Sequence, residues 1–149
     1  TDKLGNIIAP FVTAAVNVHD SQLVPAALSG FVEFADLIDL DVWGKPFVWD
    51  SGFDAGWIRN DLADRTFIPV IKPRVILRKN KAKTNEILDE FLSVEYIYKG
   101  RFVNERTFAW EDTYRKLTTR YEKLNCTFNG FRYLAYAMIN FRWLFGKKD

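Results

Sequence analysis

Two carboxylates in this sequence stand where they could hold a metal ion. Asp50 ends the run KPFVWD, which is rich in strand-forming residues and is followed by a turn containing glycine. Glu105 lies within YKGRFVNERTFAW, where Tyr98, Phe102 and Glu105 are spaced at i, i+4 and i+7 and would share one face of a helix. A carboxylate is rarely placed on such an apolar face without a partner, so we expect Glu105 to be buried and paired.

A strand-end aspartate and a helix glutamate together suit a hard divalent cation. Acids at the carboxyl ends of strands lie where open α/β sheets bind their ligands. Mg²⁺ takes oxygen ligands, usually one or two carboxylates together with phosphate. Two metal ions held in this way would activate a water molecule or a 3′-hydroxyl against a phosphodiester. We therefore expect the carboxylates of Asp50 and Glu105 to converge.

Both acids also have simpler interpretations. Asp50 can be a turn or capping residue, and Glu105 can pair with Arg101, four residues earlier. His19 is the one histidine, so a metal site built from histidines is excluded and we expect a capping or loop role. Cys126 is the one cysteine, which rules out a disulfide framework, and we expect it to be a small buried residue.

The composition is that of one globular domain. The chain has 149 residues, 48% of them hydrophobic and 16% aromatic, and we expect the five tryptophans to lie mostly in its core. A net charge of +2 does not decide for or against nucleic acid. The stretch from Arg65 to Lys83 holds seven basic residues and no acid, so it is either a solvated loop or a loop that contacts phosphates. No apolar run reaches the roughly 18 residues that span a bilayer, so we expect no membrane partner.

The elements expected around these residues alternate between strands and helices, which predicts one α/β domain. Three short runs predict strands: IIAPFVTAAV (7–16), KPFVWD and TFIPVIKP. Helices are expected after a cap at Asp20 or Ser21, and from Ala55 to about Asp64 with Asp54 as its cap. Further helices are expected from about Glu86 to about Leu124, with Gly100 as a weak point, and from about Phe128 to Phe145, with an apolar face made of Phe131, Leu134, Ala135, Met138, Phe141 and Leu144.

Longer stretches resemble a known family. The runs NVHDSQL, WDSGFDAGWIRNDL, IPVIKPR and ERTFAWEDTYRKLTTRYEKL…GFRYLAYAMIN resemble the C-terminal half of bacterial insertion-sequence transposases with a DDE catalytic domain. The resemblance is strongest from Tyr98 to Asn140. It implies a ribonuclease H-like core, in which a mixed sheet is flanked by helices. An Asp on the first strand, an Asp ending the fourth strand and a Glu on a late helix there bind two Mg²⁺ (or Mn²⁺) ions.

The family signature Y-x-x-R-x-x-x-E-x-x-x-x-x-x-K falls on Tyr98, Arg101 and Glu105 at the required spacing. The resemblance thus makes Glu105 the third acid and Asp50 the second. The lysine of the signature falls on Asp112, which departs from the pattern. The resemblance implies that DNA is contacted by Tyr98, Arg101 and Arg106, and by Arg115 or Lys116 in place of that lysine.

The N-terminal part of the chain departs from the family pattern more than Asp112 does. In this alignment 7–15 is the third strand of the core, and the family's first Asp would lie on a strand upstream of TDKLGN. Residues 1–149 are therefore expected to be a partial, N-terminally truncated transposase DDE catalytic domain that is inactive alone. The intact enzyme would cut and join DNA strands at insertion-sequence ends. The alternative is an inactive remnant that at most binds DNA non-specifically.

The resemblance also implies partners and a location. The partners are DNA, as transposon ends and target, and further copies of the chain in a possible homo-oligomer of the intact enzyme. The location is the cytoplasm, at the nucleoid when the protein is bound to DNA.

Overall fold

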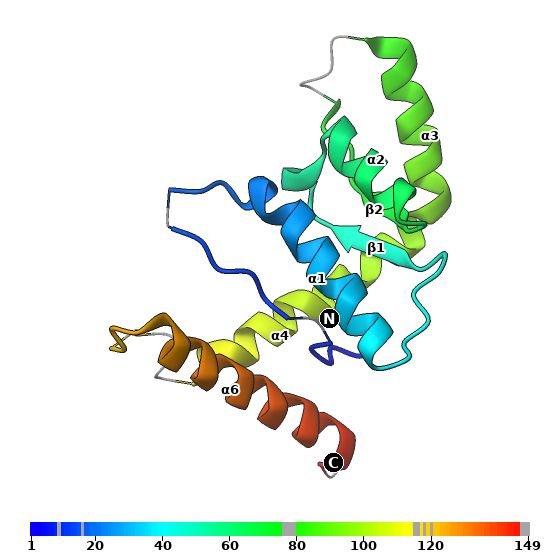
Figure 1. The fold of residues 1–149 in the computed structure, drawn as a ribbon. Coiled ribbons are helices and arrows are strands. Elements are labelled where there is room, and N and C mark those ends of the chain that lie inside the picture. The colour runs from blue at the N-terminus through cyan, green and yellow to red at the C-terminus, as the bar shows by residue number, and fades with distance from the viewer. Residues whose placement is uncertain are drawn as a thin grey trace. The chain divides into compact units, whose positions relative to one another are not determined.

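The structure, a computed structural model, describes residues 1–8, 10–15, 17–75, 80–114, 117, 119 and 121–146. The chain forms two compact units (Figure 1). The terminal unit consists of Thr1–Ile8 with Phe102–Asp149, and the central unit consists of Ala9–Arg101. Asp50 therefore belongs to the central unit and Glu105 to the terminal unit.

The central unit is built on two parallel strands. β1 (Pro46–Trp49) and β2 (Ile68–Ile71) pair so that Trp49 lies opposite Ile71. α2 (Gly56–Asp64) connects them, so that strand, helix and strand form a βαβ unit. The two runs KPFVWD and TFIPVIKP are thus confirmed as strands.

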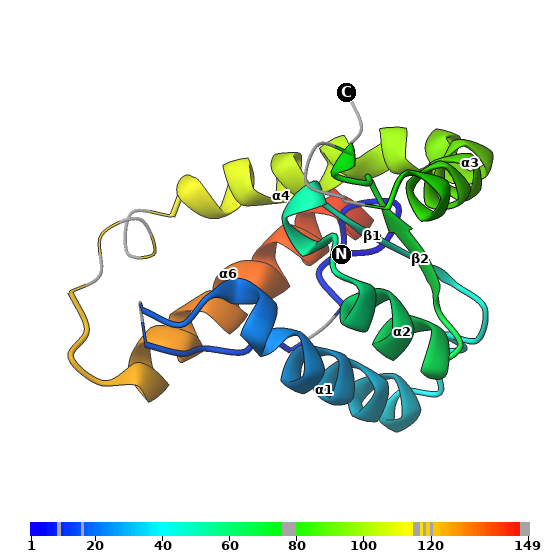
Figure 2. The ribbon, with the colours of Figure 1, turned by 90° about the horizontal axis from the view of Figure 1, so that it is seen from above.

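Helices cover both faces of this sheet. Figure 2 shows α1 (Val24–Leu37) and α2 on one side of the strands and α3 (Lys81–Tyr98) on the other. The rings of Phe31, Phe47 and Phe67 pack between α1 and the sheet, with the centroids of Phe47 and Phe67 4.5 Å apart. Side chains at helical spacing meet the branched residues of β2 in a core that contains Leu28, Ile58, Leu62, Val70 and Ile71.

The prediction that Asp20 or Ser21 caps the first helix is wrong. Asp20 and Ser21 lie inside a 3-10 turn, Asp20–Leu23, which precedes α1. The Nδ1 atom of His19 caps this turn by accepting a hydrogen bond from the Ser21 amide. The capping role expected for His19 is therefore confirmed.

The long helix expected from about Glu86 is interrupted where glycine weakens it. Asn80 caps α3 by accepting a 3.2 Å hydrogen bond from the Lys83 amide, so α3 begins earlier, at Lys81. Gly100 lies in a 3-10 turn, Lys99–Arg101, which confirms the predicted weak point. α4 (Phe102–Asp112) follows and ends well before Leu124, because the amides of Thr113 and Tyr114 bond three residues back and tighten its last turn.

In the terminal unit, α4 and α6 (Asn125–Phe145) hold the first residues of the chain. The Arg106 guanidinium donates to the Leu4 carbonyl at 2.7 Å, and the Thr107 hydroxyl donates to the Gly5 carbonyl at 3.2 Å. Gly5 has a φ of +95°, which residues with side chains rarely adopt, and a Cβ there would crowd Arg106 Nη2 at 3.0 Å, so the position favours glycine.

The strand expected over 7–16 is wrong: its described residues have no strand structure. The backbone groups of Ile7 that a neighbouring strand would bond are taken by one side chain. Ile7 N–H donates to Asn140 Oδ1 at 2.8 Å, and Asn140 Nδ2 donates to the Ile7 carbonyl at 2.9 Å. Pro10 also lacks an N–H to donate. The order of elements therefore begins with a helix.

α6 buries a different face from the one expected. Of the predicted apolar face, Ala135 is buried, but Leu134, Met138, Phe141 and Leu144 are exposed. Tyr136 and Ile139, outside that face, are buried instead. Polar anchors explain the rotation, because Asn140 bonds Ile7, and Arg132 and Tyr136 bond Glu111 of α4. No helix formed by the described residues is long and apolar enough to cross a membrane.

Candidate metal and DNA site

Asp50 follows β1 directly, at the carboxyl end of the parallel pair, as expected. Its carboxylate caps the 3-10 turn Ser51–Phe53 by accepting a hydrogen bond from the Gly52 amide. The residue is exposed. The turn-capping interpretation is therefore confirmed, and it leaves the carboxylate accessible from solvent.

Two cations follow β2 at the same edge. Trp49, the last residue of β1, lies opposite Ile71, the last residue of β2. The residues that follow them, Asp50 and Lys72, are therefore neighbours at this edge of the sheet. Lys72 and Arg74 are both exposed. Nη2 of Arg74 lies 3.5 Å from the place that a Cβ on Gly52 would take, so this guanidinium borders the turn that Asp50 caps. One edge thus presents a carboxylate for a cation and basic groups for a phosphate.

Asp54 is not the helix cap that the sequence indicated. The N-cap of α2 is Ala55, and no side chain caps it. The Asp54 side chain, only 1% exposed, accepts from Arg59 Nη2 at 2.8 Å and Nε at 3.1 Å, and from the Arg74 amide at 2.7 Å. Arg59 Nη2 also donates to the Ile71 carbonyl at 2.8 Å. Sequence reasoning missed this network, because a spacing of five residues is not that of a helical ion pair.

Glu105 lies in the first turn of α4 and is exposed, so its expected burial is wrong. Phe102 and Phe108, on the face expected to point inward, are 60% and 63% exposed. The buried residues of α4 are Val103 and Thr107, because Thr107 bonds the Gly5 carbonyl and turns the opposite face inward. Near a helix N-terminus the carboxylate of Glu105 is favourably placed in the helix dipole.

The expected DNA-contacting residues have different surroundings. The Arg101 guanidinium lies 5.8 Å from the centroid of the Tyr98 ring, which packs edge-on against Phe91. Arg106 serves the terminal unit itself, with its guanidinium 5.0 Å and 4.9 Å from the ring centroids of Trp110 and Trp143. Arg115 and Lys116 lie outside the described residues.

The basic stretch from Arg65 to Lys83 is not uniform. Arg65 has a structural role, because it joins α2 to α1. Its Nε donates to Asp61 at 2.8 Å and its Nη2 donates to the Ser29 hydroxyl at 3.1 Å. Arg78 and Lys79 lie outside the described residues. Exposed basic side chains are found at Lys72, Arg74, Lys81 and Lys83.

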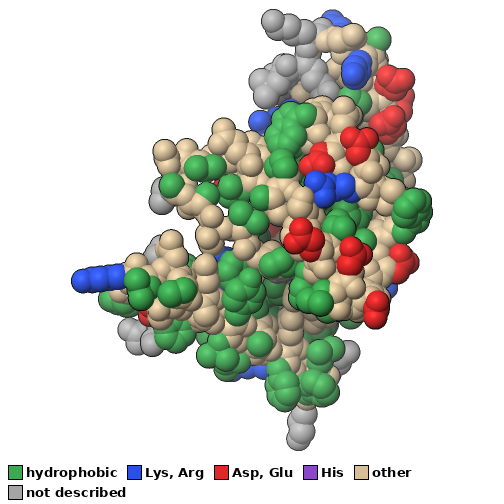
Figure 3. All heavy atoms as spheres, viewed as in Figure 1, with side chains coloured by type: hydrophobic (Ala, Val, Ile, Leu, Met, Phe, Trp, Pro, Cys, Tyr) green, Lys and Arg blue, Asp and Glu red, His purple; other side chains and the backbone are tan. Residues whose placement is uncertain are grey.

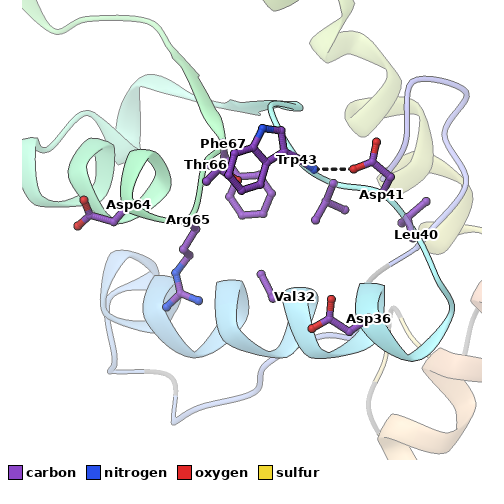
Figure 4. A pocket seen from close by; sticks show the side chains of 10 residues that line it. Val32, Asp36, Leu40, Asp41, Trp43, Asp64, Arg65, Thr66 and Phe67 are labelled. Atoms are coloured by element: carbon purple, nitrogen blue, oxygen red, sulfur yellow. Dashed lines mark hydrogen bonds between the residues drawn. The ribbon is translucent and has the colours of Figure 1, made fainter.

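The opposite end of the strands offers a hollow of about 430 Å³. Figure 4 shows Trp43 beside Phe67 on one side and Val32 and Asp36 of α1 on the other. Figure 3 shows acidic side chains on the face of the molecule seen there. Glu33 and Asp36 of α1 and Asp64 of α2 are exposed acids of the central unit. Asp36, Asp41 and Asp64 thus border the hollow, whereas the edge at Asp50 carries the exposed cations Lys72 and Arg74.

Other side chains that could have done chemistry take different roles. Cys126 is exposed, so its expected burial is wrong. None of the five tryptophans is fully buried, and Trp43 and Trp57 are 74% and 48% exposed, so they do not form the core. Within the described parts of the chain, no group of three or more His, Cys, Asp or Glu is placed to hold a metal ion.

A buried tyrosine joins α4 to α6 in the terminal unit. The Tyr136 hydroxyl donates to Glu111 Oε2 at 2.8 Å and accepts from Arg132 Nη2 at 2.8 Å, while Arg132 Nε donates to Glu111 Oε1 at 3.2 Å. Burial, together with the hydrogen bond to Glu111, raises the pKa of Tyr136 to about 12. The phenol is therefore held neutral, as a donor.

This pKa predicts how stability depends on pH. Because the folded state holds the proton more tightly than the unfolded state, the stabilisation is complete below the ordinary pKa of 10.0 and is lost as the pH rises to about 12. A rise in pKa of this size corresponds to about 2.7 kcal/mol, which solvent screening reduces to roughly 2 kcal/mol. Urea unfolding between pH 9 and 12 should show it, and Tyr136→Phe should flatten the curve by that amount. Equal slopes for the two proteins would contradict the assignment.

The comparisons agree with the sequence resemblance. No curated protein and no solved structure matches the chain. A family model described as "Transposase DDE domain" matches residues 1–140, a range that includes both Asp50 and Glu105. Enzymes of this family generally use a divalent metal and act on DNA. Since the match covers nearly the whole sequence, this chain belongs to the transposase DDE domain family.

Proposed function

We propose that this chain is part of a bacterial insertion-sequence transposase whose intact form cuts and joins DNA strands at the ends of the element by two-metal phosphoryl transfer. The observation that carries the proposal is the place of Asp50, at the carboxyl end of a parallel strand inside a region that matches the DDE family. The parallel pair with helices on both faces would be part of a ribonuclease H-like core. The partner of the intact enzyme would be DNA, as transposon ends and target, so the enzyme would act in the cytoplasm at the nucleoid. The intact enzyme would assemble as a homo-oligomer.

Asp50 and Glu105 are the proposed metal ligands. Both are exposed carboxylates, and Mg²⁺ or Mn²⁺ prefers such hard oxygen donors. When bound, the ions would supply Lewis acidity and an activated water or 3′-hydroxyl. Asp50 is oriented for this by the Gly52 amide, which binds one carboxylate oxygen. A third carboxylate of the family would complete the set.

Basic residues would hold the DNA through its phosphates. Lys72 and Arg74 border the Asp50 turn, and Arg101 with Tyr98 matches the family signature. Such contacts position the DNA without distinguishing bases, so binding should weaken as salt rises. Arg106 is the weakest of the proposed contacts, because the Leu4 carbonyl and two tryptophan rings already engage it; Arg115 and Lys116 complete the set.

Cross-linking tests whether the two acids converge. The chain has a single cysteine, so Cys126→Ser provides a thiol-free background. In that background Asp50→Cys combined with Glu105→Cys should be joined by Cd²⁺ or by a short bifunctional thiol reagent, because ligands of shared metal ions lie close together. The control pair is Asp61→Cys with Glu105→Cys, since Asp61 lies near the other end of α2 and should not react. Equal cross-linking of both pairs, or of neither, would refute the proposal.

A further inference from the structure

The buried pair Asp54 and Arg59 ties together the two loops that leave the sheet at the Asp50 edge. Asp54 follows the turn capped by Asp50, and it accepts from the backbone amide of Arg74 beyond β2. Arg59 binds Asp54 through two nitrogens and reaches the last carbonyl of β2, at Ile71. Four hydrogen bonds of 2.7–3.1 Å therefore fix the chain around Arg74 against the chain after β1.

The pair of Asp54 and Arg59 determines where the exposed side chain of Arg74 lies. The backbone of Arg74 is anchored by Asp54, while its guanidinium borders Gly52, the residue whose amide binds Asp50. A long side chain whose backbone is held in place loses less freedom when it binds a phosphate, so anchoring favours the contact.

We propose that Asp54 and Arg59 are positioning residues for DNA: they hold the guanidinium of Arg74 beside Asp50, where it binds a backbone phosphate. This rests on the proposed function, since it presumes that DNA binds at this edge. Asp54 and Arg59 themselves touch neither DNA nor metal. They act through Arg74.

The loss of charge and the loss of positioning predict opposite effects of Asp54→Asn on the affinity for DNA. The substitution keeps the shape of the side chain but removes a negative charge, which by long-range attraction would strengthen DNA binding. Asparagine has one accepting oxygen in place of two, so it cannot accept from both Arg59 and the Arg74 amide, and the loss of positioning would weaken binding. For a fluorescent 20-base-pair DNA duplex at low salt we expect roughly fivefold weaker binding, with a salt slope smaller by about one.

The control matches this change in charge. Asp61→Asn weakens the pair with Arg65, whose Nε lies 2.8 Å from Asp61 Oδ1, as Arg59 Nη2 does from Asp54 Oδ1. It removes the same charge near the start of β2 rather than its end. We expect Asp61→Asn to leave the affinity unchanged or slightly raised. Equal weakening by both substitutions, with both proteins folded by circular dichroism, would overturn the proposal.

A double-mutant cycle shows whether the effect passes through Arg74. Arg74→Gln should weaken binding about as much as Asp54→Asn, and adding Asp54→Asn to it should change nothing further. Additive losses would overturn the inference. If Asp54→Asn fails to fold, Arg59→Lys replaces it in the cycle, because lysine keeps the charge but cannot reach Asp54 and Ile71 together.

The outcomes separate the inference from the function on which it rests. If the unsubstituted protein does not bind the duplex at low salt, the proposed DNA function fails. If it binds, and Arg74→Gln weakens binding while Asp54→Asn and Arg59→Lys do not, then DNA binds at this edge and only the positioning role is wrong.

Discussion

A plasmid carrying the element's ends should stay intact with the 149-residue chain in Mg²⁺ or Mn²⁺, and should be nicked by a chain extended upstream through an aspartate-bearing strand. The reason is the number of carboxylates. The family resemblance implies three acids around two ions, and Asp50 and Glu105 supply two of them. We propose that the third acid comes from a strand outside residues 1–149, so that these residues alone hold the ions too weakly against the charge of the phosphate. The difference should be on the order of 10³-fold or more, the scale at which the loss of one member of a catalytic unit acts.

Substitutions in the extended chain identify the acids. Asp50→Asn and Glu105→Gln should each abolish nicking, because each removes a charged oxygen ligand. Asp41→Asn is the control, since Asp41 is exposed at the other end of the strands and pairs with Lys45. Cutting by the 149-residue chain that Glu105→Ala abolishes would mean that another acid completes the site. An extended chain that never cuts would favour the inactive remnant.

The parts of the fold that depend on neighbouring residues could be predicted from the sequence. β1, the turn after Asp50, β2 and the break at Gly100 all follow from neighbouring residues: branched and aromatic runs, glycine in turns, and proline at strand ends. The position of Asp50 at a strand end could therefore be predicted. The strand expected over 7–16 could not be judged in this way, because a strand exists only with a partner, and the Ile7 backbone bonds a side chain 133 residues away.

Burial was harder to predict than the helices themselves. α4 carries large apolar groups on more than one face, since Phe102 and Phe108 are exposed while Val103 is buried. Apolar spacing alone therefore does not decide which face turns inward. Polar contacts decide it here: Thr107 with Gly5 on α4, and Asn140 with Ile7 on α6. These partners lie more than 100 residues apart, so no short sequence window reveals them.

Arg59→Ala should be the most destabilising single substitution in the central unit's polar network. It removes the guanidinium that binds the buried carboxylate of Asp54, which is 1% exposed, through two nitrogens. Breaking a buried pair in this way costs about 3–5 kcal/mol. Arg65→Ala is the matched control, because Asp61 remains 24% exposed and solvent can replace its partner, for a cost of about 1 kcal/mol. The measurement is the urea midpoint of each variant, and similar shifts would contradict the buried assignment.

Replacing both partners separates stability from position. In Asp54→Leu with Arg59→Met no charge is left buried, and apolar replacements of buried pairs are often neutral or stabilising. The double variant should therefore recover much of the stability that Arg59→Ala loses, although the Arg74 amide and the Ile71 carbonyl lose their partners. If the pair exists to hold Arg74, DNA binding should stay weak in this protein while its urea midpoint returns towards that of the unsubstituted chain. Recovery of both together would mean that the pair contributes to folding alone.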